Sequence, residues 1–353
     1  MELFRQQPHI RHAHYIYPND VMNLVYRHRC SKREAFDRVF ARVPPNTVSL
    51  YVTGIGLESL PSMKHLTQLK NLDISVNGLQ ELPELPEGLI MLDCSSNHLT
   101  SLKNTPSTVR FLVGSRNEIS TLSWLPQGLT SLAVPYNKLE DIDGFPPSLT
   151  LCNMSYNQLT FLPPLPATIQ QLDCMHNNLV ELPASLPTSL QRLLCSGNPR
   201  LLHLPPLPHN LKWLTVKGCG IVRLPTFPEG LSIFDASNSS VSQMVNIPPS
   251  LVQNGGLLDR TPIGNIIDFP EAALFSERLI RVRLNLEKLN RFRELYYTLK
   301  YKRQFRQWLW IKVRLPRIER ENHPDRLQER LEAMEREGTE VDMEAVLQSF
   351  GNS

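Results

Sequence analysis

The chain has 353 residues, of which 41% are hydrophobic and 20% charged, and its net charge is +3. It contains no run of about 18 apolar residues, so we expect no membrane-spanning helix. Its first residues lack the apolar core of a secretory signal. Five of its six cysteines fall at the apolar positions of a repeat, where a thiol packs as a small core group. We therefore expect free thiols and a cytoplasmic protein, because disulfides are rare in reducing compartments.

Residues 1–46 are predicted to form a helical cap. Asn19 or Asp20 is expected to begin a short helix, and Ser31 followed by Glu34 is a capping box that begins a second one. The second helix has one apolar stripe with helical spacing, formed by Phe36, Val39, Phe40 and Val43. A solenoid needs a shield over its first coil, and this segment is placed to provide one.

Residues 47–253 repeat a unit of 20 residues. An asparagine marks each unit, and the last step is 21 residues long, at Asn77, Asn97, Asn117, Asn137, Asn157, Asn177 and Asn198. The frame around it reads L-x-L-x-x-N-x-L-x-x-L-P, and a proline-rich link such as LPELPEGL follows. A fixed period of this size indicates a solenoid. We identify about ten leucine-rich repeats.

The fold predicted from this unit is an α/β solenoid, a horseshoe with a parallel sheet on its concave face. The L-x-L segment is a short strand whose leucines point inward while the alternate residues point outward. The asparagine amide can satisfy backbone groups of the adjoining coil that would otherwise be buried unpaired. The paired prolines fix φ and lack an N–H, so we expect extended links on the convex side and helices only at the two ends.

Units of 20 residues with LPxLP links resemble the leucine-rich repeats of secreted bacterial effectors of the Yersinia and Shigella type. Some of those effectors carry a ubiquitin-ligase domain with a Cys-x-Asp nucleophile. This chain has no cysteine after Cys219, and no cysteine is followed two residues later by Asp, so the resemblance does not extend to that activity. The segment WLWIKVRLPRIERENHPDRL also resembles tail segments of repeat proteins from giant DNA viruses.

No motif for catalysis, metal binding or cofactor binding stands out. The chain lacks a glycine-rich phosphate loop, a His-Glu-x-x-His element and a G-x-S-x-G elbow. We predict no enzyme activity and no cofactor.

The outward strand positions of the repeats are the predicted recognition surface. Apolar residues occur at several of them, and a contiguous exposed apolar patch usually marks an interaction site. The predicted partner-binding residues are Met91, Phe111, Val113, Leu151, Leu194, Trp213 and Ile233. The alternatives are that they are scattered, or that the termini of the chain cover them.

After a connecting segment at 254–273, residues 274–353 are predicted to be helical, first basic and then acidic. Between Arg278 and Arg317 there are 13 Lys or Arg against two Glu, a local charge of +11. Residues 318–353 have ten acidic residues against four arginines. Basic and aromatic side chains together suit a polyanion, and the predicted contacts are Arg291, Arg293, Lys300, Lys302, Arg303 and Arg306. Pairing with the acidic tail is the alternative.

These features predict a non-enzymatic scaffold that binds a protein partner through the concave face. The resemblance implies a pathogen protein, bacterial or viral, that binds a host protein in the host cytoplasm. The alternative function is binding of nucleic acid or an anionic membrane through the basic segment.

Overall fold

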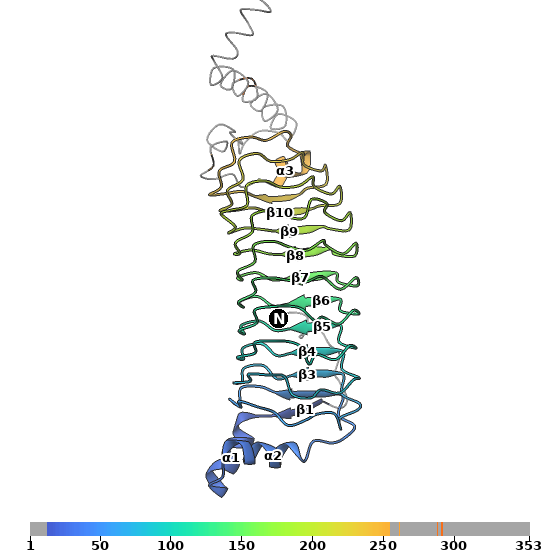
Figure 1. Cartoon of the computed structure of the whole chain (residues 1–353), viewed down its shortest axis with the longest axis vertical. Coiled ribbons are helices and arrows are strands. Elements are labelled where there is room, and N and C mark those ends of the chain that lie inside the picture. The colour runs from blue at the N-terminus through green and yellow to red at the C-terminus, as the bar shows by residue number, and fades with distance from the viewer. Residues whose placement is uncertain (1–12, 255–260, 262–287, 289–290, 292–353) are drawn as a thin grey trace, which may run out of the picture. The chain divides into compact units, whose positions relative to one another are not determined.

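A computed structural model describes residues 13–254 together with Thr261, Lys288 and Arg291. Its main feature is a parallel sheet of 11 strands that follow one another in chain order (Figure 1). The strands are β1 (Ala13–Ile16), β2 (Ser49–Val52), β3 (Asn71–Asp73), β4 (Met91–Asp93), β5 (Phe111–Val113), β6 (Ser131–Ala133), β7 (Leu151–Asn153), β8 (Gln171–Asp173), β9 (Arg192–Leu194), β10 (Trp213–Thr215) and β11 (Ile233–Asp235). The predicted leucine-rich-repeat solenoid with a parallel sheet is confirmed.

The core lies directly behind this sheet. In each of the repeat strands β3 to β11 the central residue points inward and is buried, and Leu72, Leu92 and Leu112 occupy the same register on three neighbouring strands. Because each coil repeats the same inward positions, apolar side chains stack from coil to coil. The outward side of the strands is called the sheet face below, and it corresponds to the predicted concave face.

The asparagines form the predicted ladder of hydrogen bonds between coils. The Nδ2 of Asn117 donates to the carbonyl of Cys94 at 3.0 Å, and its Oδ1 accepts from the N–H of Leu99 at 3.0 Å. Where the repeat has a cysteine, the Sγ of Cys219 lies 3.2 Å from the carbonyl oxygen of Cys195 and replaces part of this bonding. The ladder therefore connects each coil to the one before it, and from Asn97 to Asn198 the asparagines are buried from water.

The links that return the chain to the next strand are not helical, as predicted. From the link before β4 onward, each makes a tight turn at a proline, such as the one in which the N–H of Leu129 donates to the carbonyl of Pro126 at 3.0 Å. Two isolated parallel bridges, Thr121 with Asp141 and Arg223 with Gln243, join neighbouring coils just before the links.

The N-terminal end differs in part from the prediction. The second helix, α2 (Lys32–Phe40), has the predicted capping box, in which the N–H of Glu34 donates to the Oγ of Ser31 at 3.2 Å. The first helix, α1 (Pro18–His28), begins earlier than expected, because Tyr17 is its N-cap and Asp20 accepts from the N–H of Tyr17 at 3.2 Å.

Residues 13–46 contain a strand that the predicted helical cap did not include. Ala13–Ile16 forms β1 and pairs in parallel with β2, which adds a strand before the first repeat. In Figure 1 the helices α1 and α2 lie at this end of the sheet. The four residues of β1 do not follow the repeat frame, so the 20-residue period could not predict this strand.

A short helix, α3 (Pro249–Asn254), follows β11. The predicted connecting segment at 254–273 and the helical region at 274–353 lie outside the described residues, apart from Asn254, Thr261, Lys288 and Arg291. The domain limits therefore stay a prediction. Within the described residues, no helix is both long enough and apolar enough to cross a membrane.

Candidate functional site

The sheet face presents two outward rows, from the first and the third residue of each strand from β2 to β11. The first row runs Ser49, Asn71, Met91, Phe111, Ser131, Leu151, Gln171, Arg192, Trp213 and Ile233. The second row runs Tyr51, Asp73, Asp93, Val113, Ala133, Asn153, Asp173, Leu194, Thr215 and Asp235. These twenty positions carry four aspartates and one arginine, so their net charge is −3.

The predicted partner-binding residues fall into two groups on this face. Phe111 and Val113 lie together on β5, while Leu194, Trp213 and Ile233 lie on β9, β10 and β11. Leu151 lies between the groups on β7. Ile233 is 43% exposed, and the other five are partly exposed.

Met91 differs from the other predicted partner-binding residues because it is buried. It occupies an outward position, yet only 6% of it is exposed, so the expectation that it meets solvent was wrong. Its register neighbours are Asn71 on β3 and Phe111 on β5. Met91 therefore belongs with the core rather than with the exposed apolar residues.

Arg192 and Trp213 form one unit on β9 and β10. The guanidinium carbon of Arg192 lies 4.2 Å from the centroid of the Trp213 ring, a cation–π arrangement. Within the described residues, the Nε1 of Trp213 and the Oγ1 of Thr215 are buried without a hydrogen-bond partner. The sequence identified Trp213 as an outward aromatic residue but could not show the arginine above its ring.

The aspartates of the second row have a structural role that sequence reasoning missed. The Oδ1 of Asp93 accepts from the N–H of Ser95 at 2.9 Å, and the Oδ1 of Asp173 accepts from the N–H of Met175 at 3.1 Å. Burial is the main cause that raises the pKa of both carboxyl groups above the ordinary value of Asp. Each carboxylate therefore holds a local turn through its hydrogen bond and carries a charge that is partly removed from water.

Beside this row stands an aromatic column, defined as Tyr136, Tyr156 and His176. Successive ring centroids are 4.3 Å apart in both pairs, and the planes differ by 8° and 15°. The guanidinium carbon of Arg116 lies 5.2 Å from the centroid of the Tyr136 ring, at the first end of the column. At the other end, a Cβ on Gly197 would come within 2.6 Å of the Nδ1 of His176, so a side chain there would collide with the ring.

The backbone under the column is in the left-handed region. The φ angles of Tyr136, Tyr156 and His176 are 57°, 56° and 52°, a conformation that bulky residues adopt rarely. Each residue directly precedes a ladder asparagine. The sequence signal was present as aromatic residues spaced by 20 at this position, but the leucine frame does not include the position.

A shallow basin of about 230 Å³ opens on the sheet face between β6 and β9, and we call it the β6–β9 basin. Its outward lining includes Ser131, Leu151, Asn153, Gln171, Asp173 and Arg192. In each of the coils of β6, β7 and β8, the residue of the aromatic column lies three positions after the last residue of the lining strand. Tyr136 follows Ala133 in this way, and His176 follows Asp173. The basin thus lies between the two apolar groups and beside the column.

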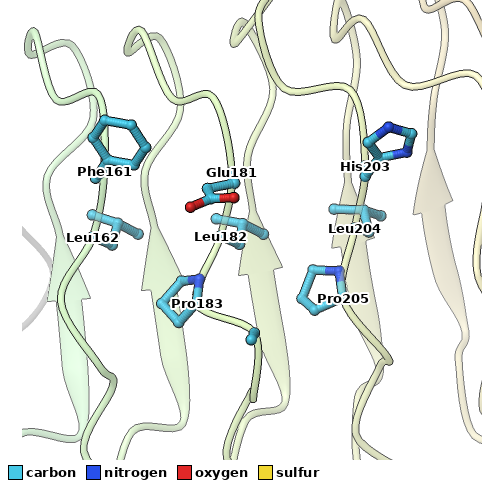
Figure 2. Close-up of a pocket in the computed structure, with 9 residues that line it drawn as sticks. Phe161, Leu162, Glu181, Leu182, Pro183, His203, Leu204 and Pro205 are labelled. Atoms are coloured by element: carbon cyan, nitrogen blue, oxygen red, sulfur yellow. The ribbon is translucent and has the colours of Figure 1, made fainter.

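A second hollow, of about 280 Å³, lies on the link segments. Figure 2 shows Phe161, Glu181 and His203 in one row, with a row of leucines next to them and the strands behind. Phe161 is 54% exposed. None of the predicted partner-binding residues lines this hollow.

The described residues offer little for covalent chemistry. All six cysteines are free thiols. Burial raises the pKa of the Cys219 thiol to about 11 and raises that of Cys94 further, so both stay protonated at neutral pH. Among the described residues, no group of three or more His, Cys, Asp or Glu side chains is placed to hold a metal ion.

The predicted polyanion contacts fall almost wholly outside the described residues. Arg291 is helical and exposed. Arg293, Lys300, Lys302, Arg303 and Arg306 are outside the described ranges, so their proposed role stays a prediction.

Comparisons with solved structures connect the fold to bacterial effectors. The chain is similar to YopM, a leucine-rich effector protein from Yersinia pestis, with a TM-score of 0.56 and 28% identity over 62% of this chain and 61% of that chain. It is also similar to YopM from Yersinia enterocolitica WA-314 (TM-score 0.48, 31% identity, 61% of this chain and 54% of that chain). A Shigella effector leucine-rich-repeat domain matches with a TM-score of 0.38, 25% identity, and coverage of 58% of this chain and 87% of that chain.

The chain spans less than two thirds of the length of either YopM structure. No protein-family model and no curated protein sequence matches it. Together with the parallel sheet of 11 strands, the similarity to the Yersinia pestis effector shows a leucine-rich-repeat protein that resembles bacterial effectors.

Proposed function

We propose that this leucine-rich-repeat chain is a non-enzymatic scaffold that binds a protein partner through its sheet face. The partner belongs to the host cell, and the chain acts in the host cytoplasm as a pathogen protein of the effector type. The support for the pathogen role is the similarity to YopM from Yersinia pestis, whose structure is described as that of a leucine-rich effector protein.

The observation that carries the proposal is the placement of the apolar residues. Phe111 and Val113 on β5, and Leu194, Trp213 and Ile233 on β9 to β11, are at least partly exposed at positions that point away from the core. They contribute little to the packing behind the sheet, whereas burial against a partner removes apolar surface from water. Aromatic residues such as Phe111 and Trp213 are frequent anchors of protein interfaces.

The experiment is affinity capture from host-cell lysate with the intact chain and with a Phe111→Asp/Trp213→Asp double variant. We expect the double variant to lose the captured partner without a large change in melting temperature. The matched control is Phe161→Asp, which places the same change on an exposed phenylalanine of the link segments. Retained capture by the double variant, or loss of capture by the control, would place the recognition surface elsewhere.

The rival function is polyanion binding through the basic segment 278–317. A charge of +11 over this segment favours it, and phosphate-driven binding weakens steeply as salt is raised. Binding through the sheet face should respond to salt mildly, since apolar contacts dominate it. A salt series therefore separates the two functions.

A further inference from the structure

We propose that the β6–β9 basin receives a lysine or arginine side chain of the protein partner, with its charged end at Asp173. This inference rests on the proposed function, because it assigns a chemical class to what the sheet face binds. It concerns the basin between Phe111 and Trp213, which shares only Leu194 with the two apolar groups.

The carboxylate of Asp173 has no ion-pair partner among the described residues. The Oδ1 of Asp173 accepts from the N–H of Met175 at 3.1 Å. The nearest arginine in the lining, Arg192, lies over the Trp213 ring at 4.2 Å instead. A cation from a partner would therefore find an available acceptor.

The surroundings favour a cation over an anion. The basin lining contains two charged residues, Asp173 and Arg192. The guanidinium of Arg192 is already engaged, because it lies over the Trp213 ring and donates to the Oε1 of Gln171 at 3.5 Å. Both rows together carry −3, so the sheet face is complementary to a basic segment. Burial raises the pKa of Asp173 more than the Met175 N–H and the charge of His176 lower it, which indicates a carboxylate short of solvation.

The shape suits a long side chain. Ser131 and Ala133, which line the basin on β6, have small side chains and fill little of its space. Leu151 and Leu194 line it as apolar groups, and the methylene stem of Lys or Arg packs favourably on such groups while its head stays polar. A volume of about 230 Å³ accommodates one such side chain rather than a folded element.

The aromatic column follows the strands that line the basin without lining it itself. The stacked rings of Tyr136, Tyr156 and His176 support one another at 4.3 Å. The hydrogen bond with Tyr136 is the largest cause that raises the pKa of Tyr156, and the carboxylate of Asp173 adds to it, so the column and the acid act on each other. Stacked side chains next to the basin are already ordered, and such ordering lowers the entropy cost of binding.

To test this proposal, peptides that bind the intact chain are selected from a phage library of random decapeptides. We expect the selected peptides to share a lysine or arginine next to apolar residues. A synthetic copy of the best peptide is then measured by fluorescence anisotropy, together with a copy in which citrulline, which is neutral and of nearly the same shape, replaces arginine. Where the shared residue is lysine, acetyl-lysine provides the neutral copy. The neutral copy should bind about tenfold more weakly.

Asp173→Asn is the test variant, and its turn should be kept because Asn153 makes the same bond to the N–H of Ser155 at 3.0 Å. We expect about a tenfold loss for the basic peptide and no further loss for the neutral copy, since both changes remove one interaction. Asp93→Asn is the matched control. It removes the same charge from the same row but outside the basin, and it should change affinity less than twofold.

The outcomes separate this inference from the proposed function. Binding that is lost in Phe111→Asp/Trp213→Asp but unchanged in Asp173→Asn would keep the sheet face as the binding surface and overturn the basic anchor. Equal losses in the Asp173 and Asp93 variants would also overturn it, because they would show a general charge effect. A library without a basic consensus overturns it as well.

Discussion

The side-chain amide of Asn137 donates to the carbonyl oxygen of Gly114, 23 residues earlier, at 2.9 Å. Its Oδ1 accepts from the N–H of Ile119 at 3.1 Å, so one side chain satisfies a donor and an acceptor of the preceding coil. Asn137 itself is only 9% exposed. An apolar residue at this position would leave the N–H of Ile119 without its partner in a region that excludes water. The carbonyl of Gly114 would lose one of its two donors and keep the Nδ2 of Asn117 at 3.1 Å.

We therefore predict that Asn137→Leu lowers the free energy of unfolding by about 1–3 kcal/mol. The control is Lys138→Leu, one residue later. Lys138 is exposed, and its ion pair with Glu118 at 2.7 Å lies at the surface, where such a pair contributes little. Urea unfolding of both variants gives the comparison, and equal midpoints would contradict the ladder.

Val76 offers a prediction in the opposite direction. It is 57% exposed and has a φ of 57°, which is unfavourable for a β-branched residue. Asn238 occupies the equivalent position of a later coil with a φ of 55°, and asparagine tolerates this conformation well. We expect Val76→Asn to stabilise the protein by about 1 kcal/mol.

The measurement is again the unfolding midpoint. Val180→Asn is the control, because Val180 is similarly exposed, at 41%, but is not among the residues with positive φ. It should change stability little. A destabilised Val76→Asn variant would mean that the valine side chain makes a contribution beyond its backbone conformation.

The sequence predicted the parts of this fold that repeat, and among the parts that occur once it predicted the helix α2 but missed the strand β1. Leu72, Asn77 and their equivalents recur every 20 residues, so strands, core and ladder could be read before the structure. The strand Ala13–Ile16 has no earlier copy to align with, and its pairing with β2 depends on where α1 and α2 place the chain.

The candidate site was predicted less completely for a related reason. A period of 20 residues predicts whether a side chain points inward or outward. It does not predict how far neighbouring side chains cover it or contact it. Met91 points outward and is buried all the same. Arg192 covers Trp213, and the stacking of Tyr136 on Tyr156 depends on backbone angles that the leucine frame does not encode.

The buried charge of Asp93 makes stability depend on pH. Burial raises its folded-state pKa, so the folded protein binds the proton more tightly than the unfolded chain does, and this group's contribution to stability falls as pH rises through that range. Asp93→Asn removes the charge and can keep the bond to the N–H of Ser95. We expect the variant to be at least as stable as the parent at pH 7.

That advantage should shrink as the pH is lowered toward the ordinary pKa of Asp, about 4, because the parent carboxyl group then becomes neutral as well. Melting temperatures of the two proteins between neutral and acidic pH give the comparison. A variant that is less stable than the parent at neutral pH would show that the Asp93 charge is well solvated or paired.

The last prediction decides between the two functions and concerns residues 318–353. If this acidic segment neutralises the basic segment 278–317, its deletion should expose a charge of +11. The truncated chain should then bind a labelled oligonucleotide or anionic vesicles without sequence preference, and the affinity should collapse between low and moderate salt. The intact chain should bind neither, because a tethered acidic segment competes at high effective concentration. Fluorescence anisotropy across a salt series measures the difference. Equally tight binding by both chains would make polyanion binding, rather than protein binding through the sheet face, the leading function.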